Sequence, residues 1–329
     1  MAASTTASPS SSKIHTALRG FLEHAEKEAG HPPFEKPRSK LPYDGEVPEY
    51  PTIEEPLFTQ RHIQHLNRMF ESVCLKDLLK WCAITIPNMV QVTSFGPTGM
   101  VLLDYLHKME MKLPTIYLDT LHHFDESIAH AKLAAEAYSL DLRVYHCRYA
   151  RSEEEFRQVF DCADMWQSDV DRFDQLVKVE PLKRGLHELG AEAWLTGRRS
   201  SQGGAREKLD LFEIDPVDGR LKINPLAHWS HSDVWAHIRS EKLIYNPLHD
   251  QGYKSIGDKY TTKPVGADDP ERAGRFIQHS TKTECGIHGC DVQEILRRHR
   301  ERRAAAAAAA QANNQTRNEQ GIQPNEIPI

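Results

Sequence analysis

The sequence lacks a long hydrophobic run. Its longest apolar stretches, such as MVLLDYL at residues 100–106, are too short to span a lipid bilayer. The opening residues, MAASTTASPSSSK, contain no hydrophobic segment of the kind found in secretory signals. We therefore expect a protein that is neither secreted nor inserted in a membrane.

Cysteine is also scarce, and the chain has no excess of positive charge. Six scattered cysteines in 329 residues argue against a disulfide framework and indicate a reducing compartment, so the predicted location is the cytoplasm. The formal net charge of −6 gives no reason to expect a nucleic-acid partner, although it does not exclude a local basic pocket. The cysteines are Cys74, Cys82, Cys147, Cys162, Cys285 and Cys290.

The two ends of the chain differ in composition from its centre. Residues 1–56 combine a low-complexity start with repeated prolines, which predicts a disordered or extended leader. Residues 301–329 contain an alanine run that favours helix but offers no bulky face to bury, which predicts a disordered or helix-prone tail. A folded domain is expected over residues 57–280, followed by a separate segment at 281–300.

The centre alternates between strand-like and helix-like segments. Strands that alternate with helices of ten or more residues imply βαβ units and a parallel sheet. The predicted fold class is therefore α/β, with a parallel sheet flanked by helices. The predicted strands span residues 88–95, 113–120, 142–147 and 191–199, and the predicted helices span 98–109, 126–139 and 152–160.

Ligands of such sheets bind beyond the carboxyl ends of the strands, and the first loop there is SFGPTG at residues 94–99. Backbone N–H groups at a glycine-bearing turn and a helix N-terminus form an anion site. The loop is not a Walker loop, because no Gly-Lys-Ser/Thr follows, and a tight turn that merely needs glycine is the alternative. The candidate substrate-binding residues are Ser94, Phe95, Gly96, Thr98 and Gly99.

The next predicted strand ends in LDTLHHF at residues 118–124. Asp119 and Thr120 are candidates to bind a ribose hydroxyl or a base edge; the alternative is that one of them caps the following helix. His122 and His123 are adjacent and do not share a helical face, and no third ligand has a useful spacing. We therefore expect no metal site.

The loop after the fourth predicted strand, GRRSSQGGAR at residues 197–206, is rich in arginine. Arginine presents a planar fork that matches phosphate or sulfate oxygens, and glycines allow the backbone to approach them closely. We expect a polyanion pocket here rather than a solvated basic loop. The candidate residues are Arg198, Arg199, Gln202 and Arg206, with Lys183 upstream.

A thiol lies near the end of the expected folded part, in TKTECGIHGC at residues 281–290. The thiolate is the nucleophilic form of cysteine and is favoured by nearby cations, while the glycines of this stretch argue for mobility. Zinc ligation by Cys285, His288 and Cys290 is an alternative, but a fourth ligand and paired spacing are missing. The groups expected to act on the Cys285 thiol are Lys282, Arg275 and His288.

Taken in order, these motifs resemble the phosphoadenylyl sulfate (PAPS) reductases of sulfate assimilation, and the fungal type most closely. The likeness runs from FTQRHIQHLNRMF to TKTECGIH, nearly all of the expected folded part. Any single motif is a weak signal, whereas eight in the same order are specific. They are SFGPTG, YLDTLHHF, KVEPLKRGL, TGRRSSQGGAR, KINPLAHWS, NPLHDQGYKSIGD, ERAGRF and TECGIH.

The resemblance implies an adenine nucleotide α-hydrolase-like fold with a modified phosphate-binding loop. It also implies reduction of PAPS to sulfite and adenosine 3′,5′-bisphosphate, with thioredoxin or glutaredoxin as electron donor and no bound cofactor. Cys285 would attack the sulfur of the sulfate group and become a Cys S-sulfonate, from which a thioredoxin thiolate would release sulfite.

The resemblance assigns further roles near the C-terminus. Residues 281–300 would be a mobile catalytic segment, with His288 as a second catalytic residue. Tyr253 would donate a hydrogen bond near the sulfate, the alternative being ordinary aromatic packing. Arg275 would join the substrate-binding residues.

Relatives that reduce adenylyl sulfate generally hold an iron–sulfur cluster on an adjacent cysteine pair and a downstream C-x-x-C. Neither pattern occurs here, so we expect no iron–sulfur cluster, which favours PAPS as the substrate. Three alternatives stay open: an adenylyl sulfate reductase without a cluster, an adenylating ATP pyrophosphatase of the same fold, and a nucleotide-binding redox sensor. A homodimer is the expected assembly, although no residue specifies it.

Overall fold

The computed structural model describes residues 50, 56–216, 218–279 and 282–288. The predicted tail, Cys290 and all of the predicted leader except Tyr50 and Pro56 lie outside the described residues. Within the described part of the chain, no helix combines the length and the apolar character needed to cross a membrane.

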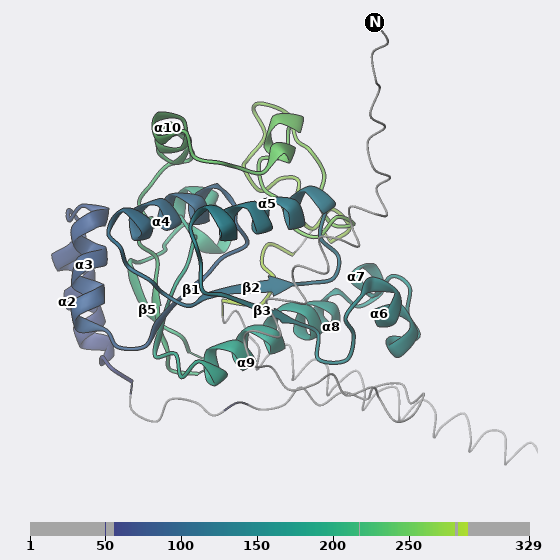
Figure 1. Ribbon diagram of the computed structural model, residues 1–329, viewed down its shortest axis with the longest axis horizontal. Helices are drawn as coiled ribbons and strands as arrows, with labels where there is room; N and C mark the ends of the chain where they lie inside the picture. The colour runs from purple at the N-terminus through teal and green to yellow at the C-terminus, as the bar shows by residue number, and fades with distance from the viewer. Residues whose placement is uncertain (1–49, 51–55, 217, 280–281, 289–329) are drawn as a thin grey trace, which may run out of the picture. The chain divides into compact units, whose positions relative to one another are not determined.

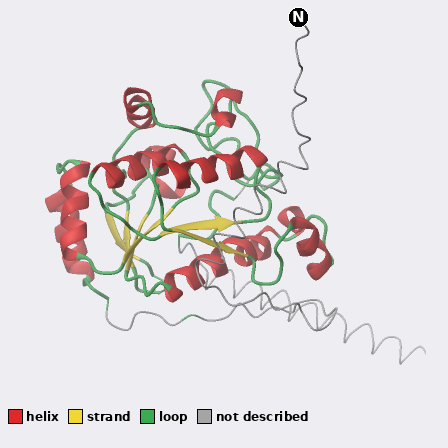
Figure 2. Ribbon diagram, in the orientation of Figure 1, coloured by secondary structure: helices red, strands yellow, loops and turns green. Residues whose placement is uncertain are grey.

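The described residues contain one mixed sheet of six strands, in the order β3-β2-β1-β4-β6-β5 (Figures 1 and 2). Neighbouring strands pair in parallel from β3 to β6, and β5 runs antiparallel to β6 at one edge. The predicted α/β class is confirmed. The strands are β1 (Met89–Val92), β2 (Thr115–Asp119), β3 (Leu142–His146), β4 (Ala193–Leu195), β5 (Phe212–Ile214) and β6 (Leu221–Ile223).

Helices cover both faces of the sheet. Figure 1 shows α4 (Pro97–Lys108) and α5 (Asp125–Ala137) on one face and α9 (Glu180–Glu188) on the other. Successive strand residues point to opposite faces, so Val90 and Trp194 pack with α9, whereas Tyr117 packs with α4 and α5. Burial on both faces explains why the strands are apolar runs rather than alternating patterns.

The remaining helices pack at the two ends of the sheet. Near β6, a core cluster joins α2 (Gln60–Phe70), α3 (Leu75–Thr85) and α10 (His231–Glu241). Beyond β2 and β3, a second cluster holds α6 (Glu153–Phe160), α7 (Met165–Ser168) and α8 (Val170–Asp174). A π-helical turn, η1 (Gln175–Val179), joins α8 to α9.

The strand order places a switch point between β1 and β4. From β1 the chain moves through α4 to β2 on one side, whereas β4 lies on the other side of β1. Doubly wound sheets bind ligands beyond the carboxyl ends of the two strands at such a point. The loops that follow β1 and β4 therefore face one crevice.

Candidate active site

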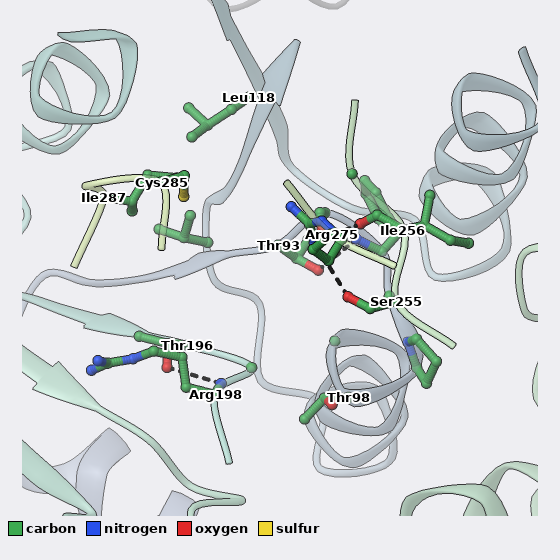
Figure 3. Close-up of a pocket in the computed structure, with 18 of the residues that line it drawn as sticks. Thr93, Thr98, Leu118, Thr196, Arg198, Ser255, Ile256, Arg275, Cys285 and Ile287 are labelled. Carbon is green, nitrogen blue, oxygen red and sulfur yellow. Dashed lines mark hydrogen bonds between the residues drawn. The ribbon is translucent and has the colours of Figure 1, made fainter. Parts of the chain in front are cut away.

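A cavity of about 250 Å³ lies at the carboxyl ends of β1 and β4. Walls come from the loop after β1, the loop after β4, residues 254–258 and the segment that carries Cys285. Figure 3 shows the Cys285 sulfur turned toward the space that Thr93, Thr196 and Arg275 border. Twelve of the predicted site residues line this cavity: Ser94, Phe95, Gly96, Thr98, Gly99, Thr120, Arg198, Gln202, Arg206, Arg275, Cys285 and His288.

The loop after β1 is shaped by a side chain that binds its own backbone. The Phe95 N–H donates to Thr93 Oγ1 at 2.9 Å, and Phe95 adopts a left-handed φ of 55°. A Cβ on Gly99 would lie 2.3 Å from Thr93 Oγ1, so any other residue at this position would force the Thr93 side chain to move. Helix α4 begins directly after Gly96 without a side-chain cap, which leaves its first N–H groups available to an anion.

The arginines after β4 are already paired with carboxylates. Arg198 bonds Glu213, and burial lowers its pKa. Arg206 donates from Nε and Nη2 to the two carboxylate oxygens of Glu284 at 2.5 and 2.7 Å. The expected polyanion pocket thus has less free positive charge on this loop than the sequence indicates.

Arg199 does not line the cavity. Its side chain is buried and donates to both oxygens of Glu271, at 2.8 and 2.6 Å, and to Thr98 Oγ1 at 3.2 Å. Arg199 therefore positions Thr98 from behind the cavity wall.

Arg275 is the arginine whose partners among the described residues are neutral. Its Nη1 donates to Ser255 Oγ at 3.2 Å and to the Ile256 carbonyl at 3.1 Å, and its buried Nε has no hydrogen-bond partner there. A Cβ on Gly257 would lie 2.5 Å from the guanidinium, so glycine lets Arg275 lie flat against the backbone. Within the described part of the chain, Arg275 thus faces the cavity without a carboxylate bonded to it.

Lys178 is a cavity residue that the sequence reasoning missed. The π-helical turn buries it, and its Nζ donates to Asp174 at 2.6 Å and to Asp258 at 2.5 Å. Burial opposes the charge of Lys178, but the two carboxylates, with a smaller contribution from Cys285, raise its pKa overall. Thr120 Oγ1 donates to the other oxygen of Asp258 at 2.6 Å. Its place in the KVEPLKRGL segment, one of the motifs that carry the family resemblance, was the available signal.

Cys285 is half-buried in a segment that contacts the cavity wall on several sides. Ile287 packs on the α9 face of the sheet, and the His288 ring stacks on Trp194 with centroids 5.4 Å apart and planes 8° from parallel. Burial, together with Arg198 and other cations, holds the pKa of His288 well below its usual range. His288 is therefore neutral and does not supply the positive charge expected beside Cys285.

Three further predicted residues lie outside the cavity lining. Asp119 Oδ1 accepts the Leu121 N–H at 2.9 Å and so shapes the turn after β2, while helix α5 begins later with Phe124 as its cap. Lys183 lies on α9. The ring of Tyr253 packs edge-on against Phe124 with centroids 5.4 Å apart.

Among the described residues, no group of three or more His, Cys, Asp or Glu side chains is arranged to hold a metal ion. His122 is buried, and its Nδ1 lies 2.7 Å from the Thr120 carbonyl. Desolvation lowers the pKa of His122, which makes it a neutral core residue.

The fold and the cavity together define a doubly wound α/β protein of the adenine nucleotide α-hydrolase type, with a thiol facing the cavity at the switch point of its sheet. The model of the phosphoadenosine phosphosulfate reductase domain matches residues 88–264. The chain belongs to this family.

Similar proteins agree with this assignment. A probable phosphoadenosine phosphosulfate reductase of Schizosaccharomyces pombe is 42% identical over 234 residues, covering 70% of this chain and 86% of the relative. An adenosine 5′-phosphosulfate reductase of Halalkalibacterium halodurans is 34% identical over 230 residues, covering 70% of this chain and 97% of the relative. The crystal structure of a PAPS reductase from Candida auris, a phosphate complex, is 40% identical with a TM-score of 0.58, covering 63% of this chain and 98% of that one.

Proposed function

We propose that the protein reduces PAPS to sulfite and adenosine 3′,5′-bisphosphate, with Cys285 as the nucleophile and a thioredoxin-type dithiol as the reductant. The observation that carries the proposal is the Cys285 sulfur facing a cavity built from an anion-binding loop and Arg275. Membership of the reductase family supports it.

The first step transfers a sulfonate group to the thiol. The Cys285 thiolate attacks the sulfur of PAPS, an S–S bond forms, and the S–O bond to the phosphate breaks, so that adenosine 3′,5′-bisphosphate leaves with the electron pair of that bond. Arg275 and the N–H groups at the start of α4 stabilise the negative charge on the leaving phosphate. Lys178 interacts electrostatically with the attacking sulfur, but its pairing with Asp174 and Asp258 leaves it with little net charge to offer the site.

The second step releases sulfite. A thiolate of the reductant attacks Cys285 Sγ, the S–S bond to the sulfonate breaks, and sulfite leaves with the bonding electrons. The second thiol of the reductant then attacks the mixed disulfide, which restores the Cys285 thiolate and leaves the reductant oxidised. The overall reaction consumes two thiols and releases two protons.

Replacement of the nucleophile tests the proposal. Cys285→Ser should abolish sulfite release from PAPS with thioredoxin while keeping the affinity for adenosine 3′,5′-bisphosphate within about threefold of the native protein. Cys162→Ser is the matched control, because Cys162 is also partly exposed but does not line the cavity. Sulfite release by Cys285→Ser would refute the assignment of the nucleophile, and nucleotide binding without turnover by the native protein would favour the redox sensor.

A second candidate is reduction of adenylyl sulfate, because a bacterial relative of 34% identity is named an adenosine 5′-phosphosulfate reductase; in this chain it would proceed without a cluster. The ratio of kcat/KM for PAPS to that for adenylyl sulfate decides between the two, and we expect PAPS to be preferred by at least about tenfold. Pyrophosphate release from ATP would instead favour the adenylating alternative. The cytoplasmic location, the homodimer, the absence of an iron–sulfur cluster, and the catalytic roles of His288 and Tyr253 stay predictions.

A further inference from the structure

Glu284, the residue before the proposed nucleophile, binds the cavity wall. Both of its carboxylate oxygens accept from Arg206, at 2.5 and 2.7 Å, which is a bidentate geometry. The two side chains are each 10% exposed, so water screens the pair weakly. Burial opposes ionisation of Glu284, but Arg206 and then Arg272 outweigh it and lower its pKa. Glu284 is therefore a carboxylate at neutral pH.

Arg206 uses three of its five N–H groups on protein partners, and its Nε/Nη2 fork is occupied. Its Nε and Nη2 are used by Glu284, and its Nη1 donates to Gln202 Oε1 at 2.5 Å. A phosphate could take the same fork only by displacing Glu284. The sequence places Arg206 among the substrate-binding residues, whereas the geometry connects it to the substrate through the segment that carries Cys285.

Other contacts hold the residues that directly precede the thiol in the chain. Arg272 donates to the Thr283 carbonyl at 2.8 Å and lies 3.7 Å from Glu284 Oε2. Lys282, three residues before the thiol, contacts Asp171 at 2.8 Å and Asp174 at 3.0 Å. Lys282 and Glu284 thus carry opposite charges and bind partners on different elements, and together they fix the chain that leads into Cys285.

We propose that Glu284 is a positioning residue that, with Arg206 and Arg272, holds Cys285 over the cavity and acts in opposite directions on the two half-reactions. The expected rates of the two half-reactions rest on the proposed function. The expected position and accessibility of the Cys285 sulfur do not. While the clasp formed by Glu284, Arg206 and Arg272 is closed, the thiol is aligned for the nucleotide and screened from a protein reductant. Opening it favours attack on Cys285 by the reductant.

Glu284→Gln should therefore separate the two half-reactions. Glutamine keeps the shape of the side chain but loses the charge that pairs with Arg206, and a charge-assisted hydrogen bond contributes enough to change a rate by about tenfold. We expect sulfonation of Cys285 by PAPS, measured by rapid quench and peptide mass, to slow by about tenfold. Release of sulfite from the isolated S-sulfonate by reduced thioredoxin should accelerate about threefold. Slowing of both steps would overturn the proposal.

A second measurement needs no substrate, so it remains informative if the proposed function fails. The native protein, Glu284→Gln and Glu207→Gln are treated with N-ethylmaleimide across a pH series, and modification of each cysteine is followed by peptide mass. Glu207 is the control because its side chain is exposed on the same loop as Arg206, and exposed Cys74 serves as an internal reference.

The high-pH plateau of the rate reports access to the Cys285 sulfur, whereas the midpoint of the profile reports its ionisation. We expect the plateau for Cys285 to rise by about tenfold in Glu284→Gln and to stay unchanged in Glu207→Gln, with Cys74 unaffected in both. A shifted midpoint with an unchanged plateau would overturn the proposal, because Glu284 would then act only through its charge. A pH profile that is the same in Glu284→Gln and the native protein would also overturn the proposal.

Arg206 provides the reciprocal test. Arg206→Ala should reproduce the modification rate of Glu284→Gln, and the double variant should add no more than about twofold, because both changes remove the same contact. The affinity for adenosine 3′,5′-bisphosphate should stay within about threefold in all three proteins. A loss of affinity above about tenfold in Arg206→Ala, absent from Glu284→Gln, would show that Arg206 binds the nucleotide directly and would overturn the proposal.

Discussion

The three arginines after β4, two of which line the cavity, differ from the cavity residue Arg275 in their partners. On the loop after β4, each arginine is bonded to a carboxylate: Arg198 to Glu213, Arg199 to Glu271 and Arg206 to Glu284. Arg275 bonds only a hydroxyl and a carbonyl among the described residues. Paired arginines build and orient the walls, whereas an arginine with neutral partners keeps its charge for an anionic ligand.

This difference shows that the position of a cation in the sequence does not reveal its use. A buried ion pair is costly to break but adds little net charge to a site. An arginine that lies on backbone without a carboxylate keeps its full field in a cavity of low dielectric. Variants of these two kinds of arginine and of the loops around them should differ in effect, and they follow in order of decreasing expected change in free energy.

The largest expected effect is a loss of stability when an arginine that is paired with a carboxylate is replaced. Arg199→Ala leaves the Glu271 carboxylate unpaired, and breaking one half of a buried pair lowers the free energy of unfolding by about 3–5 kcal/mol. Urea denaturation measures this loss. The double variant Arg199→Met/Glu271→Leu should recover most of it, since neither charge then remains. Unchanged stability with loss of nucleotide binding would instead place Arg199 among the ligand-binding residues.

Low pH should lower the stability of the folded protein through His130, whose buried imidazole bonds the loop after β1. His130 Nε2 donates to the Phe95 carbonyl at 3.1 Å, and burial lowers the pKa of His130 to about 4 from 6.5. Because the unfolded chain takes up this proton between pH 6.5 and 4 while the folded protein does not, stability is present above that window and is lost as the pH falls through it.

The loss from His130 should be about 3 kcal/mol between pH 7 and pH 4. In His130→Gln the amide keeps a donor for the Phe95 carbonyl without a titrating group. Urea unfolding at a series of pH values should therefore show a slope that is shallower in the variant. Identical slopes in the two proteins would mean that His130 does not titrate as its burial indicates.

Replacement of Arg275, whose partners among the described residues are neutral, should affect binding and turnover rather than folding. Arg275→Ala should lower kcat/KM for PAPS by about 10²-fold, or about 2.7 kcal/mol, because it removes charge-assisted hydrogen bonds to the substrate. The free energy of unfolding should change by less than about 1 kcal/mol, since the partners left behind are neutral. Arg275→Lys should recover part of the activity. A large loss of stability in Arg275→Ala would contradict this account, because Arg275 would then stabilise the fold as Arg199 does.

The smallest effect concerns two glycines at the junction between β1 and helix α4. Gly99→Ala brings a Cβ within 2.3 Å of Thr93 Oγ1, so we expect a loss of about 1–2 kcal/mol in stability and a weaker affinity for adenosine 3′,5′-bisphosphate. Gly96→Ala is the matched control, because its Cβ would find its nearest neighbour, Ser94 Oγ, at 3.9 Å. Equal losses in both variants, measured by urea unfolding and calorimetry, would contradict this account of the loop.

The sequence predicts the four parallel strands β1 to β4, because apolar strand-like segments that alternate with helices are a strong signal. β5 and β6 lack this signal, because each has three residues and no helix separates them. The cavity also follows from the sequence, because the carboxyl ends of parallel strands share one edge. Lys178 was missed because its exposure to the cavity depends on a π-helical turn, which no residue pattern announces.

The sequence does not show which carboxylate each arginine of the site binds. Arg198 and Arg199 are adjacent in the same motif, yet one lines the cavity and the other does not. Their carboxylate partners, Glu213 and Glu271, are separated from them by 15 and 72 residues. Only the folded backbone brings such groups together, so the sequence alone cannot distinguish a paired cation from a free one.

The transfer of sulfonate to Cys285 is tested most directly with PAPS that carries radioactive sulfur in the sulfate and radioactive phosphorus in the 3′-phosphate. The native protein is mixed with this substrate in the absence of reductant, quenched, digested and separated. We predict up to one sulfur label per chain on the peptide that contains Cys285, with an equal amount of phosphorus label released as adenosine 3′,5′-bisphosphate. Sulfur label on another cysteine, or both labels remaining together on intact PAPS, would contradict the account.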